Sequence, residues 1–115
     1  MKKVSLGAAG KFVKEGCVTY EYPLGLKNID ACFAKIVGRS PHAGFEYNTE
    51  CHEVVFIISG GGELVTARET IKFCKGDVLV IEPMEKYFWG AACDCEMFIS
   101  CNPPWEAEKH KYIEN

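Results

Sequence analysis

The densest group of side chains with acid–base or metal-binding potential lies between residues 42 and 53. Glu46, Glu50, His52 and Glu53 occur close together there, with His42 upstream. In an extended segment Glu46, Glu50 and His52 share one face, and Glu53 faces away unless a turn or bulge intervenes. Carboxylates and imidazoles bind divalent transition metals. One interpretation is therefore a metal site formed by Glu50 and His52, with Glu46 or His42 as a further ligand. The alternatives are a polar loop and a metal-free ligand contact.

The thiols form a second group with chemical potential. Seven cysteines occur, at positions 17, 32, 51, 74, 93, 95 and 101. An odd number without a CxxC pair argues against both a disulfide framework and a zinc ribbon. The CxC spacing of Cys93 and Cys95 puts both sulfurs on one side of a strand, but no second pair or nearby histidine completes a metal set. We therefore expect free thiols that act mainly as small hydrophobes, in a reducing cytoplasm.

Short β-type runs alternate with turn signals along the chain, which is typical of a sandwich or barrel. The expected strands are 18–24, 32–37, 44–48, 54–58, 63–66, 70–73, 78–81, 87–89 and 96–101. Only the segment from Pro104 to Lys111 resembles a helix, with Pro104 tolerated near its start. His110 is expected to be exposed there, because terminal helices fray. The pattern predicts an all-β jelly roll or small barrel with a short C-terminal helix.

Two of these strands are apolar on both faces. They are Val54 to Ile58 and Val78 to Ile81. A strand that lines a barrel needs only an apolar inner face, so something must cover the outer one. We expect a homodimer, because a domain this small has little surface of its own to provide the cover.

The residues that begin and end these two strands resemble the two sequence motifs of the cupins. Glu53 opens a strand that ends at Gly60, as in the first motif, and Gly76-Asp77 opens a strand that ends in Pro83, as in the second. The C-terminal segment also resembles small cupins related to sugar-phosphate isomerases. The resemblance implies one cupin-like jelly-roll domain over residues 1–115, with a core at about 17–101 and a C-terminal segment at 102–115.

The metal-binding histidines of the cupins are degenerate here. In metal-binding members an H-x-H pair precedes the motif glutamate and a third histidine follows the proline of the second motif. The pair positions fall on Tyr47 and Thr49, or on Glu46 and Asn48 if the spacing is one longer, and the third falls on Phe88. Only Glu53 is retained. The resemblance therefore implies no firm cofactor, and a divalent transition metal would need the displaced cluster described above.

The same resemblance suggests which side chains face the barrel interior. The expected pocket residues are Glu53, Tyr47, Thr49, Phe88, Val55 and Ile57. A carboxylate inside a barrel must be hydrogen-bonded, paired or protonated. Glu53 is therefore the most consequential of them, and it could act as a general base with Tyr47 or Tyr87 as the acid.

Composition narrows the possible partners. The formal net charge of −3 and the pI near 5.6 provide no basic footprint for nucleic acid or an anionic membrane. Neither a signal peptide nor a membrane-spanning segment is expected, so the cytoplasm is the default location.

Three functions remain open at this stage. The first is binding of a small metabolite, a sugar or an organic acid, inside the barrel. The second is an enzyme, either a sugar isomerase or epimerase or a metal-dependent oxygenase. The third is a structural homodimer with a filled barrel.

Overall fold

The computed structural model describes residues 1–114, and almost all of its regular structure is β-strand. The strands are β1 (Gly10–Lys14), β2 (Cys17–Glu21), β3 (Cys32–Ser40), β4 (Phe45–Asn48), β5 (His52–Ser59), β6 (Gly61–Thr66), β7 (Thr70–Cys74), β8 (Val78–Ile81), β9 (Tyr87–Asn102) and β10 (His110–Ile113). Two short 3-10 helices, η1 (Leu6–Ala8) and η2 (Ala107–Lys109), complete the structure. No helix within residues 1–114 is long and apolar enough to span a membrane.

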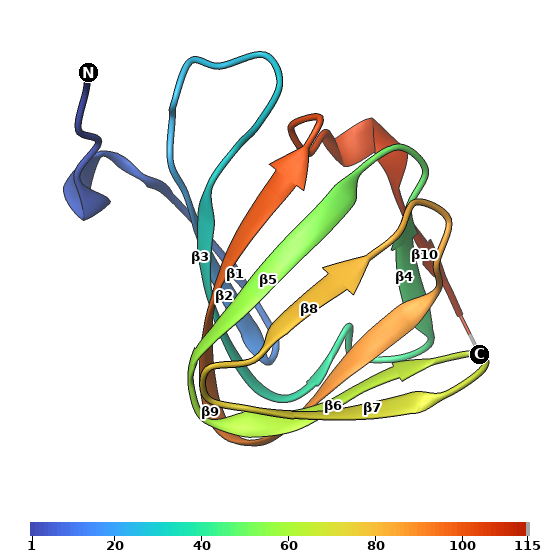
Figure 1. Ribbon diagram of the computed structural model, residues 1–115. Helices are drawn as coiled ribbons and strands as arrows, with labels where there is room; N and C mark the ends of the chain where they lie inside the picture. The colour runs from blue at the N-terminus through green and yellow to red at the C-terminus, as the bar shows by residue number, and fades with distance from the viewer. Residues whose placement is uncertain (115) are drawn as a thin grey trace.

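All ten strands belong to one sheet, which curls into a barrel-like shape (Figure 1). The long strand β9 joins its parts, because it pairs with β3, β4, β5 and β6. The first half of β9 lies beside β6 and the second half lies beside β5. The edge strands β1 and β10 come from opposite ends of the chain, and each has a single partner.

The expected strands are present, with three differences. The segments 87–89 and 96–101 are the two ends of one strand, β9, and β1 was not predicted. The predicted C-terminal helix is wrong, because the segment forms η2 followed by β10. In β10, His110 to Ile113 pair with Asn48 to Phe45 of β4. Pairing of this aromatic and β-branched segment with an available sheet edge overrides a weak local helix signal.

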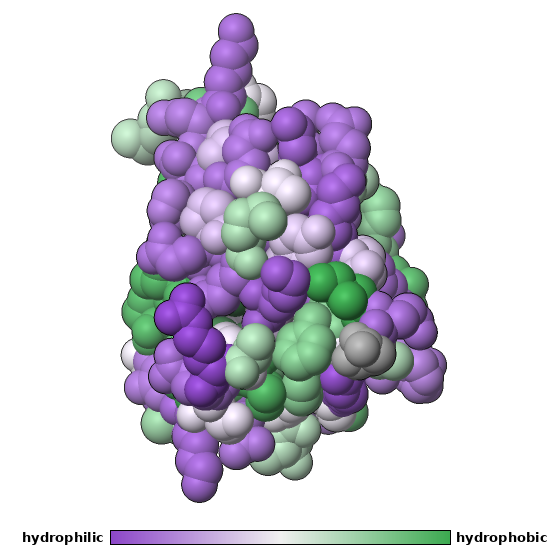
Figure 2. Space-filling view, turned by 90° about the vertical axis from the view of Figure 1, so that its right-hand side faces the viewer, coloured by the Kyte–Doolittle hydropathy of each residue, from purple (hydrophilic) through white to green (hydrophobic). Residues whose placement is uncertain are grey.

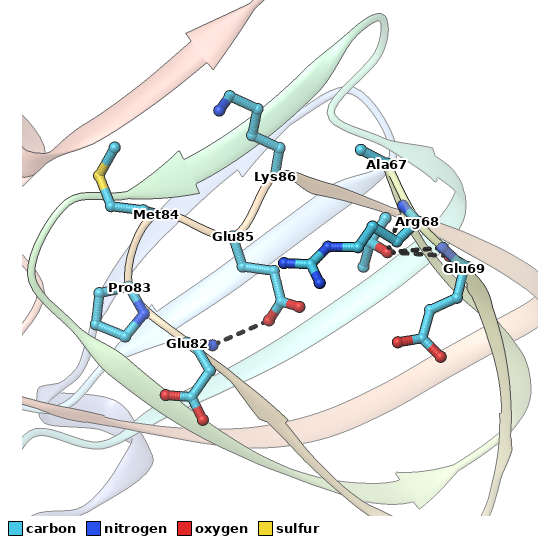
Figure 3. A pocket seen from close by; sticks show the side chains of 9 residues that line it. Ala67, Arg68, Glu69, Glu82, Pro83, Met84, Glu85 and Lys86 are labelled. Carbon is cyan, nitrogen blue, oxygen red and sulfur yellow. Dashed lines mark hydrogen bonds between the residues drawn. The ribbon is translucent and has the colours of Figure 1, made fainter.

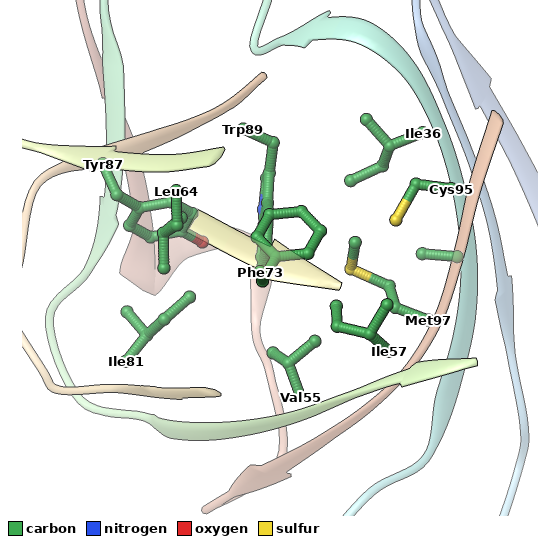
Figure 4. Packing of buried hydrophobic residues seen from close by; sticks show 11 residues of the cluster. Ile36, Val55, Ile57, Leu64, Phe73, Ile81, Tyr87, Trp89, Cys95 and Met97 are labelled. Atoms are coloured by element: carbon green, nitrogen blue, oxygen red, sulfur yellow. The ribbon is translucent and has the colours of Figure 1, made fainter. Parts of the chain in front are cut away.

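Alternation along β5 separates the interior from the surface. Glu53, Val55 and Ile57 are buried, whereas Val54 and Phe56 are exposed. Val55 and Ile57 join a hydrophobic cluster that also contains Trp89, Phe73, Leu64, Met97 and Ile36 from the other strands (Figure 4). This cluster fills one part of the barrel.

Two glycines of the cupin-like motifs have left-handed backbone conformations. Gly60 has φ +81° where β5 turns into β6, and a Cβ there would overlap the backbone of Asp94. Gly76 has φ +93° in the turn before β8, with open space around it. In that turn Asp77 accepts a hydrogen bond from the Cys74 amide through Oδ2 at 2.8 Å. The motif residues thus close corners of the sheet.

Candidate functional site

A cavity of about 610 Å³ occupies the remaining part of the barrel. Strands β1, β2, β3, β4, β9 and β10 contribute to its wall, together with Glu53 from β5. The polar side chains of its wall include Lys14, Glu46, Glu53, Tyr87, His110 and Tyr112. Trp89 and Trp105 add large apolar surfaces. Aromatic walls with a few convergent polar groups are typical of a small-molecule site.

Glu53 is the most deeply placed carboxyl group of the cavity, with 6% of its surface exposed. Burial raises its pKa from 4.5 to about 7, so the acid and carboxylate forms coexist near neutral pH. Its Oε2 accepts a hydrogen bond from the Tyr87 hydroxyl at 3.3 Å. Burial also raises the pKa of Tyr87 well above 10, so this residue remains a phenol and a donor.

Glu46 also lines the cavity, and its carboxyl group has different partners. Its Oε1 lies 2.6 Å from Nε2 of His110, whose ring is buried. On the other side of the ring, Nδ1 of His110 lies 3.3 Å from Nδ2 of Asn48. His110 and Asn48 are also paired across strands β10 and β4. The antiparallel pairing of these strands thus places the three side chains in a row.

Lys14 and Tyr112 meet at the edge strands β1 and β10. The Lys14 Nζ donates to the Tyr112 hydroxyl at 2.6 Å. Burial lowers the pKa of Lys14, but the bond to Tyr112 and the nearby charge of Glu46 outweigh it, and the pKa is raised overall. Lys14 is therefore a cation at neutral pH and partly balances the charge of the nearby Glu46.

The cysteines of the cavity wall are poor nucleophiles. Burial raises the pKa of Cys32 to about 12 and raises that of Cys101 still further. Burial also raises the pKa of Cys17. Because the thiolate is the reactive form, these side chains act as small apolar groups at neutral pH.

The three residues of the expected metal cluster do not lie together. Glu46 faces the cavity. Glu50 forms an ion pair with Lys109 at 3.1 Å, and Nε2 of His52 lies 3.0 Å from Oε1 of Glu82, both on the surface. A turn between β4 and β5 is responsible. Oδ1 of Asn48 accepts from the amides of residues 50 and 51, which ends β4 and resets the alternation before Glu53.

Most other expected pocket residues lie outside the cavity. Tyr47 points away from the interior and its ring lies under the Lys86 ammonium. Thr49 is exposed. Phe88 packs on Phe45 and stacks with the Arg39 guanidinium, 3.8 Å from the ring centroid.

Val55 and Ile57 face inward, but they belong to the packed cluster rather than to the cavity wall. Of the three expected catalytic residues, the structure brings Glu53 and Tyr87 together and leaves Tyr47 apart.

Sequence reasoning missed Lys14, His110 and Tyr112. The expectation of an exposed His110 is wrong, because only 8% of its surface is exposed. The available signal was the spacing of His110 and Tyr112, which are two positions apart and so share one face of a strand. In a helix, residues two positions apart do not share a face, so the predicted helix did not place His110 and Tyr112 together.

The side chains present do not fit the nitrogen-rich metal site of metal-binding cupins. Within residues 1–114 no group of three or more histidine, cysteine, aspartate or glutamate side chains is arranged to hold a metal ion. Both ring nitrogens of His110 already face protein groups.

A second hollow, of about 440 Å³, lies between the β6–β7 turn and the loop before β9 (Figure 3). Arg68 and Glu85 point into it, and Glu85 accepts a hydrogen bond from the Glu82 amide at 3.1 Å. Its polar groups mainly stabilise these turns, and its side chains are largely exposed. The barrel cavity, which holds the buried titratable groups, is therefore the candidate site.

Comparison with known proteins gives a clear result for the fold. No protein-family model and no curated protein matches the chain. Among solved structures, a variant of Streptomyces PAC13 with uridine matches with a TM-score of 0.88 at 13% identity, over 99% of this chain and 92% of that one. Another structure of Pac13 is described as that of a unique nucleoside dehydratase.

Ectoine synthase from P. lautus matches with a TM-score of 0.77 at 19% identity, over 98% of this chain and 90% of that one. Bacillus subtilis oxalate decarboxylase matches with a TM-score of 0.81 at 9% identity, over 98% of this chain but 33% of that one. The chain has the cupin fold. The resemblance seen in the motifs around Glu53 and Gly76 is thereby confirmed at the level of the fold. This cupin barrel has its polar groups at positions other than the usual histidines.

Proposed function

We propose that the protein binds a small, hydroxyl-bearing metabolite such as a sugar in the barrel, and that Glu53 transfers a proton to or from it. The observation that carries this proposal is a buried carboxyl group with a pKa of about 7 facing a cavity of about 610 Å³. A general acid or base works best when its pKa lies near the working pH. The desolvation that produces this pKa costs stability, and function is a reason to retain it.

The charges of the cavity favour a neutral ligand over an organic acid. Glu46 and Glu53 both face inward, while Lys14 is occupied by Tyr112 at the edge. An anionic ligand would have to approach these two carboxyl groups in a low-dielectric space. The structural neighbours, which include a nucleoside dehydratase structure with uridine, support a ligand of this size and polarity.

The chemistry most suited to this pair is proton transfer next to a carbonyl group, as in an isomerase or epimerase. The Glu53 carboxylate would remove a proton from the carbon beside the carbonyl, leaving an enolate. The Tyr87 phenol donates its single proton in a hydrogen bond to Glu53 in the free protein. Once Glu53 is protonated, the phenol would turn to donate that hydrogen bond to the enolate oxygen. Return of the proton from Glu53 to the neighbouring carbon, with transfer of the adjacent hydroxyl proton to the enolate oxygen, completes an isomerisation. An epimerisation requires the enolate to turn over first, so that Glu53 returns the proton to its other face.

Ligand-induced thermal stabilisation tests the proposal. The panel contains D-ribose, D-xylose, D-glucose, D-fructose and uridine, each compared with its carboxylate or phosphate counterpart where one exists. We expect at least one neutral member to raise the melting temperature of the wild type, because a ligand that binds only the folded state stabilises it. Glu53→Gln should abolish this rise, whereas Glu69→Gln on the exposed β6–β7 turn should not.

Two results would contradict the proposal. One is a wild type that no member of the panel stabilises. The other is a Glu53→Gln variant that responds to ligand as the wild type does. A variant that only melts at a lower temperature, with the response to ligand intact, would favour a structural role for Glu53.

We also propose that a second copy of the chain covers the outer face of β5 and β8. Six apolar side chains, 38% to 58% exposed, form a contiguous surface there: Val54, Phe56, Ile58, Val78, Val80 and Phe98. A two-fold interface uses the same surface on both copies, and an uncharged surface presents no like charges to its own copy. By contrast, the side of the molecule with β4 and β10 is mostly hydrophilic, with some apolar side chains in its lower half (Figure 2).

A further inference from the structure

The orientation of the Asn48 side chain is fixed by the backbone. Its Oδ1 accepts hydrogen bonds from the amides of Glu50 at 2.9 Å and Cys51 at 2.8 Å. An amide nitrogen in this place would face two donors, so the oxygen must lie there. The Nδ2 group of Asn48 is therefore the one that faces His110.

This orientation determines which nitrogen of His110 carries the proton. Nδ2 of Asn48 can only donate, so Nδ1 of His110, 3.3 Å away, must be the acceptor. The single ring proton then lies on Nε2 and is donated to Oε1 of Glu46 at 2.6 Å. Trp105 and Tyr112, each with a ring centroid 5.4 Å from that of His110, hold the ring in place.

The second oxygen of Glu46 is left for a ligand. It makes no hydrogen bond to any residue between 1 and 114, and in that range no fully buried side-chain oxygen or nitrogen lacks a partner. This oxygen is therefore accessible. Since Glu46 lines the cavity, the free oxygen can accept a hydrogen bond from a molecule in the barrel.

We propose that Asn48 and His110 are positioning residues that hold Glu46 as a hydrogen-bond acceptor for a ligand hydroxyl. The order of the groups, from backbone amides through Asn48 and the ring to the carboxylate, gives each hydrogen bond one direction only. The role of the ligand rests on the function proposed above, but the direction of the hydrogen bonds does not.

Nuclear magnetic resonance of the ¹⁵N-labelled protein tests the direction of the hydrogen bonds. Long-range ¹H–¹⁵N correlations at neutral pH distinguish a bare ring nitrogen from a protonated one. We expect His110 to show a bare Nδ1 and a protonated Nε2. The exposed rings of His42 and His52 serve as internal references. A protonated Nδ1 on His110 in the wild type would overturn the proposal.

Asn48→Asp is the decisive variant. It keeps an oxygen to accept from the amides of residues 50 and 51, and it replaces the NH₂ group by a second acceptor. We expect Nδ1 of His110 to gain a proton in this variant. Asn28→Asp, which makes the same change in an exposed loop, should leave the spectrum unchanged. An unchanged His110 in folded Asn48→Asp would contradict the proposed direction of the hydrogen bonds from Asn48 through His110 to Glu46. If the variant does not fold, the wild-type spectrum tests that direction by itself.

Glu46→Gln tests the role of the carboxylate in binding. The amide carbonyl oxygen of the substituted side chain can still accept from Nε2, so His110 should keep its protonation pattern. Affinity for the neutral ligand found in the thermal panel should fall by about tenfold or more, because a charged acceptor is lost. Unchanged affinity would refute the role of Glu46 while leaving Glu53 and the proposed function intact. If no ligand binds the wild type, the proposed roles of both Glu46 and Glu53 toward a ligand fail. The direction of the hydrogen bonds through His110 is then tested by the nuclear magnetic resonance spectrum alone.

Discussion

At the scale of single residues, Glu46 and Glu53 line the same cavity but have different surroundings. Glu53 is buried and receives one long hydrogen bond from a phenol. Glu46 receives a short hydrogen bond from an imidazole that is itself fixed by an asparagine. Environments that differ in this way divide acid and base roles between chemically identical groups. We therefore assign proton transfer to Glu53 and acceptance of a ligand hydroxyl to Glu46.

The raised pKa of Glu53 predicts how stability changes with pH. Below the ordinary pKa of 4.5 the Glu53 carboxyl group is protonated in both the folded and the unfolded chain. The folded state then has no charged carboxylate to bury, and the unfolding free energy is at its full value with respect to this group. As the pH rises from 4.5 through 7 the unfolded chain releases the proton first, and about 3 kcal/mol of unfolding free energy is lost. Urea denaturation at pH 5 and pH 8 measures this loss.

Glu53→Gln isolates the effect, because glutamine does not titrate. We expect the free energy of unfolding of this variant to fall less than that of the wild type between pH 5 and pH 8. Glu69→Gln should follow the wild type. Equal falls in the wild type and Glu53→Gln would show that another group dominates the pH dependence.

The thiols provide a prediction about reactivity. Cys93 and Cys74 are exposed, whereas Cys51, Cys95 and Cys101 are buried. Mass spectrometry after brief treatment with iodoacetamide at pH 8 should find Cys93 labelled first. Cys74 should follow more slowly, because the charge of Asp77 raises its pKa. Rapid labelling of Cys101 in the folded protein would contradict the described cavity wall.

At the scale of elements, turns and strand ends decide which side chains reach the cavity. The turn after Asn48 separates the alternation of β4 from that of β5, so Glu46 and Glu53 both face inward. The pairing of β10 with β4 then adds His110 and Tyr112 to the same wall. The site is therefore assembled from segments near the middle and the end of the chain.

Two glycine substitutions test the corners of the sheet. Gly76→Ala adds a Cβ in open space, so its cost should be that of the left-handed backbone alone, about 1 kcal/mol. Gly60→Ala adds the same backbone cost and also an overlap with the Asp94 backbone. Urea denaturation should therefore show a larger loss of unfolding free energy for Gly60→Ala. Equal losses would mean that the Asp94 segment moves away without cost.

At the scale of the whole molecule, the curled sheet has one packed end, one hollow part and an uncovered apolar face. The packed cluster around Trp89 stabilises the barrel, which allows the hollow part to hold buried polar groups at a cost in stability. The uncovered face on β5 and β8 is unusual for a monomer, since contiguous exposed apolar surface marks interaction sites.

A charged substitution tests this face. Phe56→Asp places a carboxylate at its centre and should convert a dimer into a monomer, because burying an unpaired charge in an interface is costly. Light scattering after size-exclusion chromatography measures the mass. Leu26→Asp, at an exposed apolar position in a loop, should leave the mass unchanged. A monomeric wild type would refute the second-copy proposal.

The sequence by itself determined the fold and one half of the site. Short β-type runs between turn signals predicted a barrel, because these features act through local backbone geometry. The glycines at the corners and the Gly-Asp-to-proline run carried the resemblance to the cupins. They also singled out Glu53. The tertiary structure decided the rest, since long-range pairing turned an expected helix into β10 and brought His110 to Glu46. It likewise placed Glu50 and His52 on the surface, where a turn made by one asparagine side chain reset the register that local alternation had suggested.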